Sequence, residues 1–265
     1  MVSLADAKIV LVGAGKMGGA LHAAWLRAGV LASNIAVVEP MGFFAAGSNA
    51  FKSLDEVTLA PDCVVLAVKP QSMDALLPAL ATKFGTKPLY LSIAAGRTLS
   101  YFKKHLGDAA VVRAMPNTPA VIGKGISALC ANAKVKENNK TLADALLLAA
   151  GQTVWLEDES QMDAVTAVSG SGPAYVFLFT EALIAAGIAQ GLPEETAKKL
   201  ALYTVRGSAK LAIKSSDPLD RLRKNVTSPG GTTEAALKVL MKDDALKALI
   251  HDAVAQAVKR SKELA

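Results

Sequence analysis

The chain has 265 residues, of which 52% are hydrophobic and 5% aromatic, so its core must be built mainly from Ala, Val, Leu and Ile. No apolar run reaches membrane-spanning length without polar interruption and no signal-peptide pattern opens the chain, so we expect a cytoplasmic protein that does not enter the membrane. The net charge of +6 is spread along the chain without interleaved aromatics, which favours a solvated basic surface over nucleic-acid binding.

The first predicted unit is a strand, a glycine turn and a helix between Lys8 and Ala28. A run rich in β-branched residues ends at the G-x-G-x-x-G segment Gly13-Ala14-Gly15-Lys16-Met17-Gly18, and apolar residues at helical spacing follow. This arrangement predicts dinucleotide binding: Gly13 permits the turn, Gly15 lets a pyrophosphate approach, and Gly18 allows close packing. The alternative is a plain turn whose glycines serve packing only.

An acidic residue is expected about 20 residues further on, at the end of the second strand. Glu39 ends the apolar run 35–38 and is predicted to hold the ribose hydroxyls. No Lys or Arg follows before Lys52, so taken alone the segment favours NAD(H) over NADP(H). The alternative is a solvated strand end.

Strand and helix patterns alternate to about residue 155, which predicts a parallel sheet. We expect a short helix within 49–59, a helix over 71–84 that Pro78 kinks or breaks, and further helices over 98–106 and 137–150. Strands are expected over 63–68, 89–93, 110–115 and 151–156. From Pro173 onwards almost every segment has helical period.

The predicted fold is therefore α/β, with an N-terminal Rossmann-type parallel-sheet domain followed by an all-helical dimerisation domain. We place the dinucleotide-binding domain at 1–156 and the helical substrate and dimerisation domain at 157–265. The apolar helices of the second domain predict a homodimer or a larger oligomer, and their alternative role is an intramolecular core.

Ligands of open α/β sheets bind beyond the carboxyl ends of the strands. The loops expected at that edge are 13–18, 67–71, 94–97 and 115–119, and they form the candidate active-site rim. In the helical half, the loop 225–234 combines paired glycines with hydroxyls at a helix start, which predicts an anion site, although Thr232 or Thr233 could instead be simple N-caps. A second segment of small residues, 169–175, would let a ligand come close. Thr166 precedes it, so its hydroxyl could point toward that ligand cavity.

The residues that are missing narrow the chemistry. His22, His105 and His251 have no partners at metal or triad spacing, no metal site is predicted, and Cys63 and Cys130 are expected to be reduced and buried. Reduction of a protonated C=N bond suits such a site, because the iminium is already electrophilic and the protein mainly orients hydride donor and acceptor.

These motifs, in this order and spacing, resemble the pyrroline-5-carboxylate reductase family over essentially the whole chain. The segments that carry the resemblance are 9–18, Ala67-Val68-Lys69-Pro70, Ser92-Ile93-Ala94-Ala95-Gly96, 113–119, 163–166 with 169–175, and Ser228-Pro229-Gly230-Gly231-Thr232-Thr233. The resemblance implies a Rossmann-type domain, a helical dimerisation domain, and reduction of 1-pyrroline-5-carboxylate by NAD(P)H to L-proline.

The resemblance also implies roles for individual residues. Ala67, Val68, Lys69 and Pro70 would line the nicotinamide side together with Ala94, Ala95 and Gly96. Thr166 is the implied hydrogen-bond or proton donor to the ring nitrogen. The residues that would hold the substrate are Glu159, Asn225, Ser228, Gly230, Gly231, Thr232 and Thr233.

Cofactor choice stays open, because Glu39 favours NAD(H) whereas the family often uses NADP(H). Lys16 replaces the family's usual Asn and would add a phosphate contact. The rival interpretations are a β-hydroxyacid dehydrogenase or related imine reductase, an NAD(P)H sensor without turnover, and a nucleic-acid binder. The helix after residue 172 lacks the Lys that such dehydrogenases need, and a sensor would not need the loop 228–233.

Overall fold

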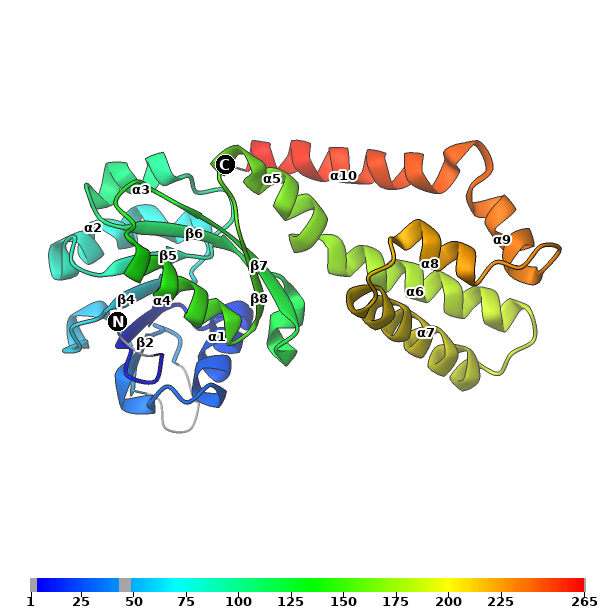
Figure 1. The fold of residues 1–265 in the computed structure, drawn as a ribbon. Coiled ribbons are helices and arrows are strands. Elements are labelled where there is room, and N and C mark those ends of the chain that lie inside the picture. The colour runs from blue at the N-terminus through cyan, green and yellow to red at the C-terminus, as the bar shows by residue number, and fades with distance from the viewer. Residues whose placement is uncertain (1–3, 43–48, 265) are drawn as a thin grey trace. The chain divides into compact units, whose positions relative to one another are not determined.

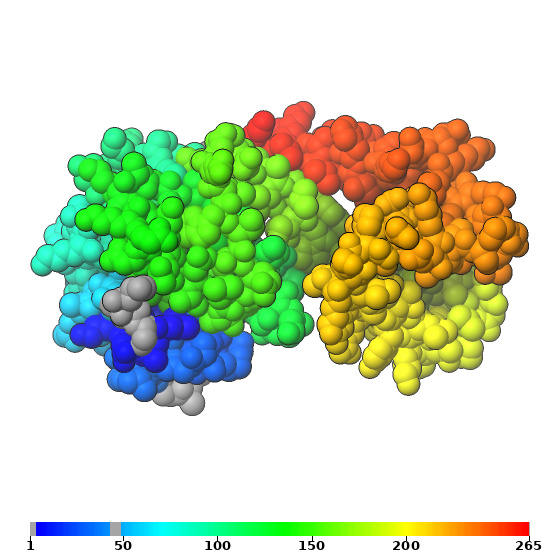
Figure 2. Space-filling model, in the orientation of Figure 1, coloured from blue at the N-terminus to red at the C-terminus, as the bar shows by residue number. Residues whose placement is uncertain are grey.

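The computed structural model describes residues 4–42 and 49–264 and divides the chain into two compact units (Figure 1). Unit 1 comprises residues up to Ser171 together with the C-terminal segment from Ala257, and unit 2 comprises Gly172–Gln256. The surfaces of both are drawn in Figure 2.

Unit 1 is built on an eight-stranded sheet with the strand order β3-β2-β1-β4-β5-β6-β7-β8. Every neighbouring pair is parallel except β6 and β7, which are antiparallel. The chain reverses direction across the sheet between β1 and β4, and this switch point is where open α/β sheets bind ligands. The strands are β1 Ile9–Val12, β2 Ile35–Val38, β3 Asn49–Phe51, β4 Cys63–Leu66, β5 Leu89–Ser92, β6 Val111–Met115, β7 Gly125–Ala131 and β8 Gly151–Trp155.

Helices cover both faces of this sheet, which explains why its central strands are apolar on both sides. Alternate residues of β1 point to opposite faces: Ile9 and Leu11 lie in one core cluster, Val10 and Val12 in the other. The first cluster includes α1 Lys16–Arg27 and α4 Glu137–Leu148, and the second includes α2 Met73–Phe84 and α3 Leu99–Leu106. The indole Nε1–H of Trp25 in α1 donates to the Leu146 carbonyl of α4 at 2.8 Å, which ties the two helices together.

The predicted α/β architecture is confirmed, with three differences in detail. Strand β7 was not expected, because its sequence Gly125–Ala131 contains small residues and no strong strand signal. The short helix expected within 49–59 is wrong: these residues form β3 and a single 3-10 turn, Leu54–Glu56. Pro78 does not break its helix, since it lies inside the α2 span.

Unit 2 is helical, as the sequence predicts. Its helices are α6 Gly172–Ala189, α7 Glu194–Lys214, α8 Leu219–Asn225, α9 Thr232–Leu240 and α10 Ala245–Glu263, the end of α10 belonging to unit 1. Among the described residues of unit 2, only Thr180, Ala197 and Ala201 are buried. This unit therefore has almost no core within a single chain.

Unit 1 continues past the end of the last strand, β8, at Trp155 as far as Ser171. Helix α5, Met162–Val165, and the π-helical turn Thr166–Gly170 belong to unit 1, where Ala167 is fully buried. The Ser261 hydroxyl donates to the Asp163 carboxylate at 2.6 Å, so the C-terminal residues also return to this unit. The domain boundary at 156 stays a prediction, drawn where the sheet ends rather than where the compact unit ends.

One helical stretch, Glu159–Ala189, is long and apolar enough to cross a membrane by length and composition alone. It comprises the 3-10 turn Glu159–Gln161, α5, the π-helical turn and α6. A helix that packs against other protein meets the same criterion.

Candidate active site

The three glycines of the turn between β1 and α1 lie in different surroundings. Gly13 has φ +90°, and a methyl group on it would lie 2.8 Å from the Ala67 backbone. A methyl group on Gly18 would lie 2.3 Å from the Gly13 carbonyl oxygen, so this position is closed by helix–strand packing. Gly15 has nothing within 4 Å of that position, so its backbone faces open space.

The N-terminus of α1 lies at this turn without any capping side chain. Gly15 is the N-cap residue and makes no side-chain cap hydrogen bond, and the first turn holds no acidic residue. Unpaired N–H groups and the helix dipole favour an anion at such an end. Lys16, exposed in this first turn, adds a positive charge. The residues present therefore fit a dinucleotide pyrophosphate above Gly15.

A pocket of about 570 Å³ extends from this turn across the carboxyl ends of β3, β2, β1 and β4. It brings together several of the predicted cofactor residues: Gly13, Gly15, Glu39, Ala67, Val68 and Lys69. The Glu39 carboxylate accepts a hydrogen bond from the Ala14 N–H at 2.8 Å and a longer one, 3.4 Å, from Met41. Glu39 is therefore fixed against the glycine turn at the wall of the pocket, and its contact with a ribose stays a prediction.

A second group of predicted residues converges around the carboxyl ends of β5 and β6. Ala94, Ala95 and Gly96 line a small cavity together with Arg113, Asp163 and Thr166. Its volume of about 10 Å³ has room for a water molecule at most. The cavity joins the predicted nicotinamide residues to Thr166 within unit 1.

Thr166 uses its hydroxyl inside its own helix. The Oγ1–H donates to the Met162 carbonyl oxygen, four residues earlier, at 2.8 Å. In this arrangement the oxygen can accept a further hydrogen bond, and the hydroxyl must turn away from Met162 before it can donate to a ligand. The residue begins the π-helical turn, a feature that is frequent at functional sites.

Glu159 forms an ion pair with Arg113, whose side chain is only 11% exposed. The same carboxylate oxygen accepts a hydrogen bond from the backbone N–H of Leu99, at the start of α3, at 2.7 Å. Glu159 thus joins β6 to the N-terminus of α3. Its role toward a substrate stays a prediction, because both of these contacts are within the protein.

The predicted substrate loop lies in unit 2, between α8 and α9. Gly230 has φ +72°, and its N–H donates to the Glu234 carboxylate at 2.8 Å. A methyl group on Gly231 would lie 2.5 Å from the Ser228 hydroxyl oxygen and 3.0 Å from the Ser228 carbonyl oxygen, so the backbone is closely packed there. Gly231 caps α9 without a side-chain hydrogen bond. The N-cap is therefore neither Thr232 nor Thr233. Both threonines lie in the first turn of α9, where Thr232 is exposed and Thr233 is half-buried. Asn225 and Ser228 of the loop are also exposed.

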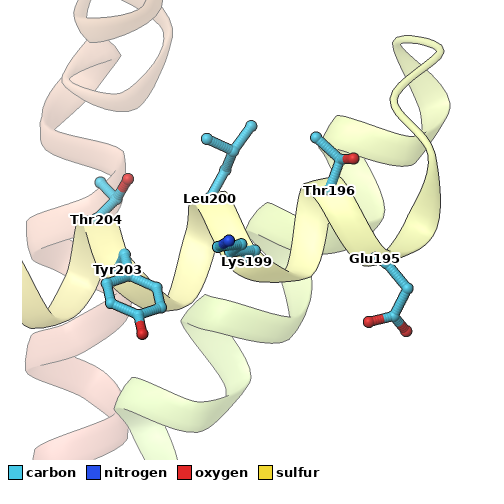
Figure 3. A pocket seen from close by; sticks show the side chains of 6 residues that line it. All are labelled: Glu195, Thr196, Lys199, Leu200, Tyr203 and Thr204. Atoms are coloured by element: carbon cyan, nitrogen blue, oxygen red, sulfur yellow. The ribbon is translucent and has the colours of Figure 1, made fainter.

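Unit 2 also carries a shallow hollow along α7, shown in Figure 3. All six of its side chains come from that one helix: Glu195, Thr196, Lys199, Leu200, Tyr203 and Thr204. A catalytic site needs groups that converge from several elements. This hollow is therefore an uncovered helix face rather than a second active site.

The described residues offer neither a cluster of metal ligands nor a reactive thiol. In the ranges that the structure describes, no three His, Cys, Asp or Glu residues lie close enough to hold a metal ion. Cys63 and Cys130 are buried free thiols, and burial raises the pKa of both, so they are neutral and poor nucleophiles. For Cys130, the Glu159 charge raises the pKa further.

Two residues that line these pockets were not predicted from the sequence. Lys52 lines the same pocket of about 570 Å³ as Glu39, whereas the sequence identified it only as the next cation after Glu39 along the chain. Arg113 lines the small cavity and pairs with Glu159, 46 residues away. The signal for Arg113 was a lone charge within an otherwise apolar strand.

Comparisons with known proteins cover nearly the whole chain. Residues 159–264 match the family described as "Pyrroline-5-carboxylate reductase dimerisation", and residues 8–96 match "NADP oxidoreductase coenzyme F420-dependent". The pyrroline-5-carboxylate reductase of Pseudomonas aeruginosa is 43% identical, with 97% of each chain covered, and that of Arabidopsis thaliana is 37% identical, with 97% of this chain and 95% of the relative covered.

Solved structures agree with these relatives. A pyrroline-5-carboxylate reductase from Coxiella burnetii superposes with a TM-score of 0.92 at 36% identity, covering 98% of each chain. The Plasmodium falciparum pyrroline carboxylate reductase, crystallised with NADP bound, superposes with a TM-score of 0.89 at 32% identity over 99% of each chain.

Proposed function

This chain belongs to the pyrroline-5-carboxylate reductase family, and we propose that the residues described above carry the reduction of 1-pyrroline-5-carboxylate by NAD(P)H. The reaction is the last step of proline biosynthesis, and the enzyme is an NAD(P)H-dependent oxidoreductase that acts on a cyclic imine. The ring carbon of the C=N bond takes up a hydride, the nitrogen keeps a proton, and L-proline and NAD(P)⁺ leave.

One observation carries the assignment of the cofactor residues: the open space over Gly15 at the uncapped N-terminus of α1. Gly13, Ala14, Gly15, Lys16, Met17 and Gly18 would hold the pyrophosphate, and Glu39 the adenosine ribose. Ala67, Val68, Lys69, Pro70, Ala94, Ala95 and Gly96 would line the nicotinamide side. When bound, the dinucleotide supplies the hydride.

On the substrate side, the protein's part is to bind, orient and hold a proton. The loop residues Asn225, Ser228, Gly230, Gly231, Thr232 and Thr233 would hold the carboxylate and ring at the N-terminus of α9, with Glu159 as a further polar contact. Thr166 would hydrogen-bond the ring nitrogen. Its oxygen accepts from the protonated imine without losing the bond to Met162, and the hydroxyl donates only if it turns.

Replacing Thr166 with valine tests this role. Thr166→Val keeps the shape and removes the hydroxyl, and we expect kcat to fall about a hundredfold with either cofactor. Thr180→Val is a matched control, because Thr180 makes the same helical hydrogen bond, to the Val176 carbonyl at 2.7 Å. Equal kinetics for wild type and Thr166→Val would remove Thr166 from the mechanism.

The first measurement is oxidation of NADH and of NADPH in parallel with 1-pyrroline-5-carboxylate as acceptor. Turnover with either cofactor supports the proposal. Tight cofactor binding without turnover would favour the rival interpretation of a sensor.

We also infer self-association as a homodimer in the cytoplasm, through the helical domain placed at 157–265, with the cofactor domain at 1–156. The dimerisation family that matches residues 159–264 and the uncovered apolar helices of unit 2 support the dimer. The two free, buried thiols support a reducing compartment. Binding to nucleic acid or to a membrane forms no part of this proposal. A binding assay with DNA and with anionic vesicles tests that exclusion, and a salt-sensitive affinity for either would contradict it.

A further inference from the structure

The ends of β2 and β3 bring a cation beside Glu39 in the nucleotide pocket. Val38 pairs with Phe51 in parallel register, and the Glu39 N–H donates to the Phe51 carbonyl at 3.0 Å. The next residues, Glu39 and Lys52, therefore leave neighbouring strands at the same level of the sheet. Both line the pocket of about 570 Å³.

The turn that carries Lys52 is fixed by another residue. The Glu56 carboxylate accepts hydrogen bonds from the Lys52 backbone N–H at 3.4 Å and from the Ser53 hydroxyl at 3.1 Å. The Lys52 side chain is exposed, and it forms no ion pair with any residue in the ranges 4–42 and 49–264. Its ammonium is free to bind an anion in the pocket.

Glu39 has the opposite constraint. Its carboxylate is held against the glycine turn by the Ala14 N–H, so it can accept a ribose hydroxyl but would repel a phosphate in the same place. A cation one strand away offsets that repulsion. The pocket wall therefore offers an acceptor for a hydroxyl and a donor for a phosphate side by side.

Building on the proposed function, we propose that Lys52 binds the 2′-phosphate of NADPH and thereby lets this enzyme use NADPH in spite of Glu39. NADH, which has a hydroxyl in that place, depends on Glu39 and not on Lys52. Lys52 is in this sense the residue that determines cofactor specificity.

Lys69 lines the same pocket but lies in a different part of it. It follows β4, and β1 separates that strand from β2, where Glu39 lies. Lys69 therefore affects both cofactors alike, and it provides the matched comparison within one pocket.

The kinetic test uses Lys52→Ala and Lys52→Gln. We expect kcat/KM for NADPH to fall at least about tenfold in both variants and kcat/KM for NADH to stay within about twofold. Lys69→Ala should lower both values by similar factors, and Lys104→Ala, an exposed lysine on α3, should change neither. Equal losses with both cofactors, or no loss with NADPH, would overturn the proposal.

A binding test separates this proposal from the assigned reaction. Calorimetry with 2′-AMP and 5′-AMP measures the phosphate contact without turnover. Wild type should bind 2′-AMP at least about tenfold more tightly than Lys52→Ala does, with 5′-AMP affinity unchanged. That result would support Lys52 even if 1-pyrroline-5-carboxylate were not reduced, whereas turnover together with equal 2′-AMP affinities would remove Lys52 and leave the reaction standing.

Discussion

The two units of this chain are stabilised in different ways. Unit 1 has a sheet whose central strands are fully buried, with a core cluster on each face. Unit 2 has long helices but buries only three residues among those described, and Phe177, Leu178 and Phe179 on α6 are each more than half exposed. Helix α6 is apolar all round, as a helix is when other protein surrounds it. Unit 1 therefore buries a core of its own, whereas the apolar helix faces of unit 2 stay exposed in a single chain, which fits the proposed dimer.

A charge on the apolar surface of α6 should have the largest effect. Leu178 is 66% exposed in the single chain, and we expect it to be buried in the proposed dimer, where Leu178→Asp would place a carboxylate in an apolar interface. We expect association to weaken by about a hundredfold or more, with loss of reductase activity. Light scattering over a concentration series measures the association.

Two features make this experiment specific to unit 2. Both tryptophans, Trp25 and Trp155, lie in unit 1, so their fluorescence should report an intact nucleotide domain in the variant. Leu31→Asp is the control, because Leu31 is 57% exposed and lies in unit 1. A Leu178→Asp protein that remains fully dimeric would place the interface elsewhere.

The second prediction contrasts two glycines within unit 1. Gly18→Ala forces a methyl group to within 2.3 Å of the Gly13 carbonyl oxygen, and we expect a loss of about 1–3 kcal/mol in the free energy of unfolding. Gly15→Ala meets no protein atom within 4 Å, so it should leave stability unchanged and weaken only cofactor binding. Thermal unfolding and cofactor titration measure the two effects. If both variants lost stability equally, Gly15 would have a packing role and the space above it would not be reserved for the pyrophosphate.

The sequence predicted the features that depend on neighbouring residues. The apolar runs of β1, β2 and β4 and the glycine turn are each contained in a few consecutive positions, and the structure has them where expected. Strand β7 was missed because its place comes from pairing with β6 and β8 rather than from its own residues. The proximity of Lys52 to Glu39 was also beyond the sequence, since it follows from the pairing of β2 with β3.

The ion pair of Arg113 with Glu159 is a similar non-local feature, and its removal is the third prediction. Arg113→Met leaves the half-buried Glu159 carboxylate without its charged partner, and we expect a loss of about 2 kcal/mol in the free energy of unfolding. The estimate lies below that for a fully buried pair because the Glu159 side chain is 29% exposed. Tryptophan fluorescence during urea unfolding measures the change in unit 1.

Lys134→Met is the matched control for this prediction. Lys134 pairs with Asp108 at 3.2 Å, but both side chains are more than half exposed, so the loss should stay below about 1 kcal/mol. Equal losses in the two variants would show that burial adds nothing to the Arg113 pair.

The smallest expected effect concerns acid, to which the two units should respond differently. His22 is 1% exposed in unit 1, and burial lowers its pKa from the ordinary value of 6.5. Because the unfolded chain then binds a proton more readily than the folded one, unit 1 should lose stability as the pH falls below 6.5, at no more than about 1.4 kcal/mol per pH unit from this residue.

His251→Gln is the control, because His251 lies in unit 2 with its side chain 81% exposed. Urea unfolding followed by tryptophan fluorescence at pH 7.5, 6.5 and 5.5 should therefore show a decline that is smaller in His22→Gln and unchanged in His251→Gln. An identical decline in His22→Gln and wild type would show that His22 does not cause the acid sensitivity of unit 1.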